Sequence, residues 1–158
     1  MLFAKDLRNW SEEGLPNEIR FKQRLTLEQI VSELSNEESG LPTIGIPTEF
    51  VSDQIQSGNL FNKQFEDCIV LKNCDHADDY FHFVFTVRRT GNSSTISVFR
   101  SGVSPLSYQY NKKELRKNDS SLLKNIMGAL TSVDNQALDA EYDYYALVID
   151  IIKDCFNI

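Results

Sequence analysis

The chain has 158 residues, 41% of them hydrophobic, and carries a formal net charge of −7. This length and composition predict one globular domain, residues 1–158, and exclude an intrinsically disordered chain. No run of apolar residues approaches the ~20 that a membrane helix needs, and the acidic balance argues against general nucleic-acid binding.

The start of the chain and its cysteines indicate a cytoplasmic protein. Asp6 interrupts the region where a secretory signal would need an unbroken apolar stretch. The three cysteines form an odd number without the regular spacing of a disulfide framework. We therefore expect a soluble, cytoplasmic protein without membrane contact.

The first element predicted is a strand over residues 18–25, EIRFKQRL, where apolar and basic side chains alternate. A period of two with one apolar face is typical of a half-buried strand, and an exposed basic face suits the edge of a sheet. The apolar members are Ile19, Phe21 and Leu25, and the basic members are Arg20, Lys22 and Arg24.

A short helix is predicted directly after this strand. Thr26 and Gln29 have the spacing of a capping box, in which each side chain accepts a hydrogen bond from the other's backbone. The apolar residues that follow, Leu27, Ile30, Val31 and Leu34, recur at helical spacing. Beyond it we expect an extended connection over 40–47 and a second short helix between Thr48 and Gly58.

The middle of the chain predicts an antiparallel meander. Residues 67–73 form an apolar strand, 80–89 alternate, and 94–100 return after the turn sequence TGNSS. A further strand is expected around Leu106, Tyr108 and Tyr110. The strand over 80–89 should place Phe81, Phe83, Phe85 and Val87 on one face.

The C-terminal third predicts two helices, one from a cap at Asp119 or Ser120 to Val133 and one from Leu138 to Phe156. The fold class expected is therefore α+β, an antiparallel sheet of about four to five strands packed against helices, two of them at the C-terminus. The apolar stripe of the last helix, which should meet the Phe row in the core, comprises Leu138, Tyr142, Tyr145, Ile149, Ile152 and Phe156.

The stretch CDHADDYFHF, residues 74–83, concentrates residues that bind metals. A zinc site would recruit Cys68, Cys74, His76 and His82, but their spacing, C-x5-C-x-H-x5-H, lacks closely spaced ligand pairs at both ends. Aspartates favour turns and are depleted in strands, so we expect a turn that leads into a strand. We predict no bound metal and no cofactor.

Motifs of catalysis are missing from the sequence. The chain has two histidines, no Gly-x-Ser-x-Gly elbow, no Gly-x-Gly-x-x-Gly and no Gly-Lys-Ser/Thr phosphate loop. We therefore expect a protein that is not an enzyme and assign no catalytic residue. The alternative is a small enzyme or ligand-binding domain with a pocket over the sheet that uses His76 or His82.

A second alternative is nucleic-acid binding by the basic block at residues 80–133, which carries a net charge of +6 although the whole chain is acidic. Aromatic residues in the same region could stack on bases. The basic residues concerned are Arg88, Arg89, Arg100, Lys112, Lys113, Arg116 and Lys117.

The last helix carries the feature that we favour as a binding site. Asp139, Asp143, Asp150 and Asp154 occupy an arc of about 60° at ~100° per residue, away from the apolar stripe. Like charges at this spacing are mildly unfavourable in a helix, which indicates a use for them. We expect a non-enzymatic binding protein, of the inhibitor or immunity type, that presents this acidic surface to a basic protein partner.

Overall fold

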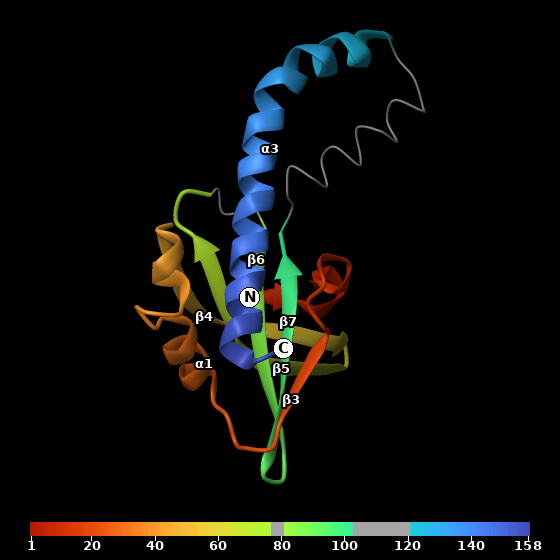
Figure 1. Cartoon of the computed structure of the whole chain (residues 1–158). Coiled ribbons are helices and arrows are strands. Elements are labelled where there is room, and N and C mark those ends of the chain that lie inside the picture. The colour runs from red at the N-terminus through yellow and green to blue at the C-terminus, as the bar shows by residue number, and fades with distance from the viewer. Residues whose placement is uncertain (77–80, 103–120) are drawn as a thin grey trace.

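A curled sheet forms the centre of the fold in the computed structural model, which describes residues 1–76, 81–102 and 121–158 (Figure 1). The strands of these residues lie in the order β1-β4-β5-β6-β7-β2, and β3 also pairs with β7. All pairs are antiparallel except β1 and β4, which are parallel. The bounds are β1 Leu2–Phe3, β2 Arg8–Asn9, β3 Glu18–Phe21, β4 Thr48–Asn59, β5 Asn62–Asn73, β6 His82–Thr90 and β7 Ser93–Ser101.

Helices cover one face of this sheet. The short helix α1 is Leu27–Leu34, and the long helix α3 is Ser121–Phe156. Figure 1 shows α3 in front of the sheet, with β7 visible beside it, and continuing beyond the end of the sheet. Three single turns of 3-10 helix lie in the connections, η1 at Ala4–Asp6, η2 at Ser11–Glu13 and η3 at Leu41–Ile44.

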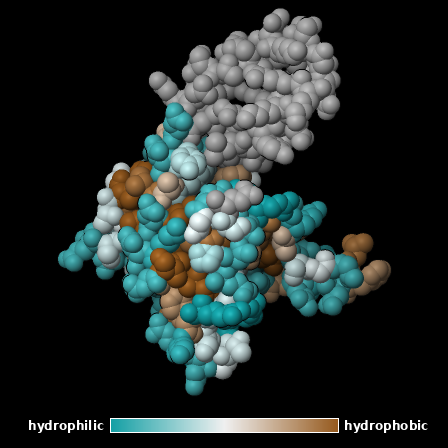
Figure 2. Space-filling model, turned by 45° about the vertical axis from the view of Figure 1, so that its right-hand side comes forward, coloured by the Kyte–Doolittle hydropathy of each residue, from teal (hydrophilic) through white to brown (hydrophobic). Residues whose placement is uncertain are grey.

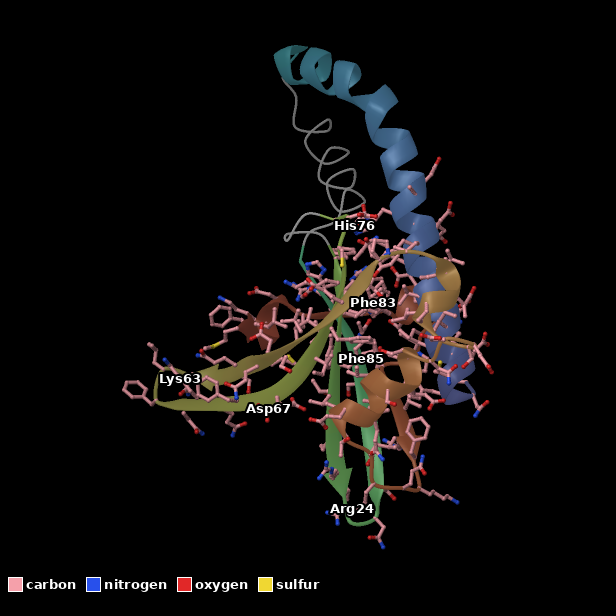
Figure 3. All side chains as sticks on the ribbon, turned by 90° about the vertical axis from the view of Figure 1, so that its left-hand side faces the viewer. Arg24, Lys63, Asp67, His76, Phe83 and Phe85 are labelled. Atoms are coloured by element: carbon pink, nitrogen blue, oxygen red, sulfur yellow. The ribbon has the colours of Figure 1, made fainter. Side chains whose placement is uncertain are left out.

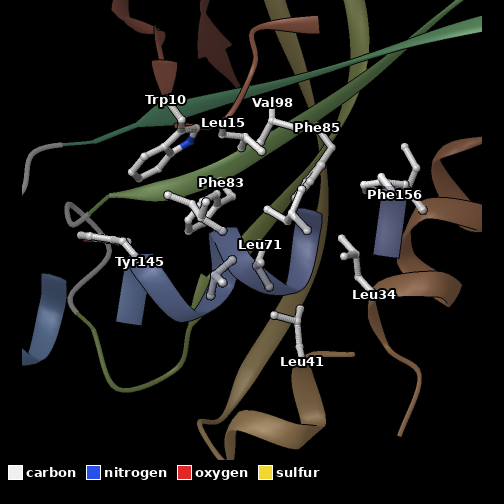
Figure 4. Close-up of a cluster of buried hydrophobic side chains, with 14 of the residues drawn as sticks. Trp10, Leu15, Leu34, Leu41, Leu71, Phe83, Phe85, Val98, Tyr145 and Phe156 are labelled. Carbon is white, nitrogen blue, oxygen red and sulfur yellow. The ribbon is translucent and has the colours of Figure 1, made fainter. Parts of the chain in front are cut away.

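The main core lies between the sheet and the helices (Figure 4). Alternation along β6 sends Phe83 and Phe85 into this core, while Val84 enters a smaller cluster with Cys68. Trp10, from the N-terminal segment, stacks on Phe83 with ring centroids 4.4 Å apart. The predicted contact between the Phe row and the last helix is confirmed, and the helix residues in this core are Tyr144, Tyr145, Val148, Ile149, Ile152 and Phe156.

The helix predicted after residue 26 is confirmed together with its cap. The Thr26 hydroxyl accepts a hydrogen bond from the Gln29 N–H at 3.1 Å, and the Gln29 side chain accepts one from the Thr26 N–H at 2.8 Å. Ile30 and Leu34 are buried beneath the helix. Local sequence signals therefore predict where α1 begins and which residues it buries.

The strand before it is shorter than predicted, because β3 ends at Phe21 and residues 22–25 lead on to α1. Arg20 is exposed on β3 as predicted, whereas Lys22 and Arg24 are exposed in the connection that follows the strand. β3 pairs with β7 along one side, which fits the predicted edge position.

Two predictions for residues 40–59 are wrong. Residues 41–44 form the turn of 3-10 helix η3 instead of an extended connection, and Pro42 lies in its first turn, where a missing N–H costs little. The predicted helix between Thr48 and Gly58 is strand β4. It pairs with β5 residue by residue from Thr48–Asn73 to Asn59–Asn62, and this long-range pairing overrides local helix signals.

The fold class is α+β, as predicted, but the strand count and the C-terminal helices differ. The described residues form seven strands instead of four to five, and α3 is one helix of 36 residues instead of two. Residues 134–138 contain no Gly or Pro, so nothing in the backbone forces a break there. The expected strand around Leu106, Tyr108 and Tyr110 and the caps Asp119 and Ser120 lie outside the described residues.

In the part of the chain that the structure describes, no helix combines the length and the apolar character that crossing a membrane requires.

Candidate functional site

The outward face of α3 carries the four aspartates singled out in the sequence. The exposed aspartates are Asp139, Asp143, Asp150 and Asp154. The positions differ by four, seven and four residues, which places them on one side of the helix, away from the core. The C-terminal half of α3 is held in place because its opposite side supplies six residues to the main core.

Two large apolar side chains are exposed on either side of the row of aspartates. Tyr142 keeps 59% of its surface exposed and Leu147 keeps 42%. Leu147 follows Asp143 by four residues and precedes Asp150 by three, so these three residues neighbour one another on the helix. We call the four aspartates with Tyr142 and Leu147 the acidic face. Aromatic and aliphatic residues among charges are typical of protein-binding surfaces.

The exposure of Tyr142 corrects one member of the predicted apolar stripe. Tyr142 lies about 80° from the centre of the buried stripe, which runs through Tyr145, Val148 and Ile152. Tyr144 and Val148, which the predicted stripe omits, are buried instead.

The aspartates of the acidic face have no charged partner among the described residues. The salt bridges there use other acids, namely Glu13, Glu18 and Asp53. Lys153 shares the helix, but its ammonium lies against the N-terminal segment, where a Cβ on Gly14 would be 3.2 Å from Nζ. Within the described residues, no salt bridge neutralises the negative charge of this face.

A second group of polar side chains is buried where α3 meets the sheet. Glu141 is 2% exposed, and the Tyr145 hydroxyl donates a hydrogen bond to its Oε1. The other oxygen of Glu141, Oε2, and the Tyr144 hydroxyl are buried without a hydrogen-bond partner in the described structure. Burial raises the pKa of Glu141, and the hydrogen bond from Tyr145 opposes that rise. Burial also raises the pKa of both tyrosines.

The sequence prediction missed Glu141, although a signal for it exists. Glu141 precedes Tyr145 by four residues and therefore falls in the centre of the buried stripe of α3. A carboxyl group at such a position must be protonated or hydrogen-bonded, because a buried charge without a partner is costly. This cost makes Glu141 a candidate functional residue.

His76 borders this buried group. Its ring lies edge-on to Tyr144, with centroids 5.2 Å apart. Burial lowers the pKa of His76, and the neighbouring His82 lowers it further. The turn predicted in the CDHADDYFHF stretch is confirmed at its start, since the Asn73 carbonyl accepts a hydrogen bond from the His76 N–H at 3.1 Å.

The four candidate zinc ligands differ in their surroundings. Cys68 is buried in the smaller cluster, where burial raises the pKa of its thiol to about 12, whereas Cys74 is exposed. No three His, Cys, Asp or Glu side chains of the described chain gather closely enough to hold a metal ion. Asp78 and Asp79 lie outside the described residues.

The structure separates the basic residues that the nucleic-acid alternative grouped together. Arg88 and Arg89 lie near the turn of the β6–β7 hairpin, where Arg89 donates a hydrogen bond to the Leu25 carbonyl at 3.1 Å. Arg100 lies at the other end of β7, paired with Glu13 at 3.2 Å. The remaining members, Lys112, Lys113, Arg116 and Lys117, lie outside the described residues.

Comparison with known proteins found no matching family model, no similar curated protein and no similar solved structure.

Proposed function

We propose that the protein is a non-enzymatic binding protein of the inhibitor or immunity type, which uses the acidic face of α3 to cover a basic surface of a protein partner. The observation that carries the proposal is the set of four exposed aspartates without charged partners in the described structure, flanked by the exposed side chains of Tyr142 and Leu147.

The physical role of the charges is to select and attract the partner. A row of carboxylates accelerates association with a basic surface and disfavours acidic partners. The apolar residues supply the contact energy, since buried aromatic side chains dominate many interfaces. Because α3 packs against the main core, the backbone that carries the aspartates is already ordered, so little conformational entropy is lost on binding.

The test compares two variants with the same change of net charge. Asp143→Lys with Asp150→Lys reverses the acidic face, whereas Glu37→Lys with Glu38→Lys reverses two exposed acids after α1. Immobilised wild type should retain a stoichiometric basic protein from a lysate of the source cells, and the protein should elute as salt rises. The first variant should lose this partner and the second should keep it.

Retention of the same partner by the Asp143→Lys, Asp150→Lys variant would refute the acidic face as the contact. Equal loss with both variants would indicate a general effect of net charge instead of a specific surface. Tyr142→Ala provides a further check, because loss of an aromatic anchor should weaken binding about tenfold or more without changing the salt dependence.

A ligand-binding or catalytic domain is the second candidate, favoured by the buried Glu141, whose Oε2 has no hydrogen-bond partner among the described residues. A carboxyl group whose pKa is raised by burial keeps its proton to a higher pH than an exposed one, and in that form it can donate a hydrogen bond. A ligand at this place should raise the melting temperature of wild type in a screen of metabolites. The shift should be absent in Glu141→Gln and unchanged in Asp143→Asn.

A further inference from the structure

The hairpin of β4 and β5 extends away from the rest of the molecule, with the labelled Lys63 toward its tip (Figure 3). β4 and β5 pair along their full length, but β6 pairs with β5 only over Ile69–Leu71. The edge of β5 over residues 62–68 therefore faces no strand of the described chain. Such an edge presents unpaired N–H and C=O groups and can add another strand.

The side chains along this part of the hairpin are in solvent. Every residue from Asn62 to Asp67 is exposed, and Phe65 keeps 53% of its surface free. The turn carries Leu60 and Phe61, which are 86% and 98% exposed, and the projection at the right of Figure 2 ends in hydrophobic surface. Exposed apolar residues on an open strand edge are unfavourable in water unless they meet a partner.

The sequence of this edge is complementary to itself. Two antiparallel copies of 62–68 centred on Phe65 place each Lys63 opposite the Asp67 of the other copy and Phe65 opposite Phe65. Residues that lie directly opposite in an antiparallel pair share a face, so both Lys–Asp pairs flank the aromatic pair. Gln64 meets Glu66 on the other face.

The neighbouring symmetric registers are less favourable. A shift toward the tip, centred on Gln64, places Phe61 opposite Asp67 and leaves Lys63 opposite Phe65. A shift the other way, centred on Glu66, sets the two Glu66 carboxylates against each other and Lys63 opposite Ile69. Charge thus selects the register centred on Phe65.

We propose that two copies of the chain associate through this edge of β5, about a twofold axis at Phe65, and join their sheets into one. Such an isologous contact is closed, so it ends at the dimer. It satisfies the backbone groups of the edge and covers Phe65, and it brings the apolar tip of each copy toward the place where the partner's β5 joins β6.

The experiment is sedimentation velocity of the full chain over a range of concentrations, with charge reversals at the paired positions. Wild type should show a reversible monomer–dimer equilibrium. Lys63→Asp alone creates two Asp–Asp pairs and Asp67→Lys alone creates two Lys–Lys pairs, so each should weaken the dimer about tenfold or more. The double variant Lys63→Asp, Asp67→Lys should restore it.

Mixing the two single variants gives the sharpest result. Each is expected to be a poor homodimer, but the Lys63→Asp edge is acidic at both paired positions and the Asp67→Lys edge is basic at both. Across the axis every aspartate then meets a lysine, so a heterodimer should form. The matched control is Glu49→Lys, an exposed acid of β4 outside the edge, which should leave association unchanged. The acidic-face variant Asp143→Lys, Asp150→Lys should also dimerise normally, which separates this contact from partner binding.

A chain that stays monomeric at all concentrations would overturn the proposal. Single reversals that dimerise as well as wild type, or single variants that fail to associate when mixed although wild type dimerises, would overturn it too.

Discussion

Phe83 shows how one residue joins the parts of the core. Its ring is completely buried on β6, stacks on Trp10 of the N-terminal segment and faces Tyr145 of α3, at a centroid distance of 6.0 Å. The alternation of Phe81, Phe83 and Phe85 made this placement predictable, since three aromatic residues at a period of two need a common apolar face. Trp10 was not predictable as its neighbour, because no local pattern surrounds it.

Phe83→Ala should therefore lower the free energy of unfolding by ~3–5 kcal/mol, since it removes a buried ring and leaves a cavity. Urea denaturation measures this value. Phe3→Ala, at a site that is 45% exposed and outside both proposed contacts, is the control and should cost less than ~1 kcal/mol. Similar losses at both positions would contradict this assignment of the core.

Glu141 predicts a dependence of stability on pH. Because burial raises its pKa in the folded protein above the ordinary 4.5, the folded state binds this proton more tightly than the unfolded state does. The stabilisation is fully present below pH 4.5 and is lost as the pH rises through the raised pKa of the folded protein. In Glu141→Gln the side chain is neutral at every pH, so the variant should not lose this stabilisation as the pH rises.

The measurement is the difference in unfolding free energy between wild type and Glu141→Gln at a series of pH values. The variant should gain stability relative to wild type as the pH rises above 4.5. A difference that stays constant over that range would show that Glu141 ionises normally in the folded protein.

Helices and hairpins that begin or end at a cap or turn in the local sequence were predictable. Strands that form only because they pair with a distant strand were not. The capping box at Thr26 and the turn at Gly91 lie within a few residues of the elements they define. β4 contains Asp53, Gly58 and other residues that are uncommon in strands, and its twelve residues become a strand by pairing with β5. The common side of the four aspartates follows from the period of one helix, whereas the exposure of Tyr142 and the burial of Glu141 beside Tyr144 depend on tertiary packing.

Helix α1 should depend strongly on its cap, because eight residues form a marginal helix in isolation. Thr26→Ala removes the hydroxyl that accepts a hydrogen bond from the Gln29 N–H, and it should lower the free energy of unfolding by about 1 kcal/mol. Ser32→Ala, on the exposed side of the same helix, should be neutral or slightly stabilising in the same urea experiment. Equal destabilisation by both changes would exclude a specific role of the cap.

At the scale of the whole molecule, the sheet separates two cores of unequal size. The larger holds the fully buried aromatic residues and both helices. The smaller holds Ile55, Cys68, Val70 and Val84, with Leu2, Leu7 and Phe99 packed against it. The smaller core buries less apolar surface, so it should open at a lower free energy than the whole protein unfolds. Cys68, which is 1% exposed, is a natural probe of that opening.

In a Cys74→Ser, Cys155→Ser variant, Cys68 is the single thiol, and its reaction with a disulfide reagent reports exposure of the smaller core. Both burial and the raised pKa of the thiol prevent reaction in the closed state, so labelling requires opening. The opening free energy from the labelling rate should be smaller than the global unfolding free energy of the same variant in urea. Equal values would mean that the two cores unfold together.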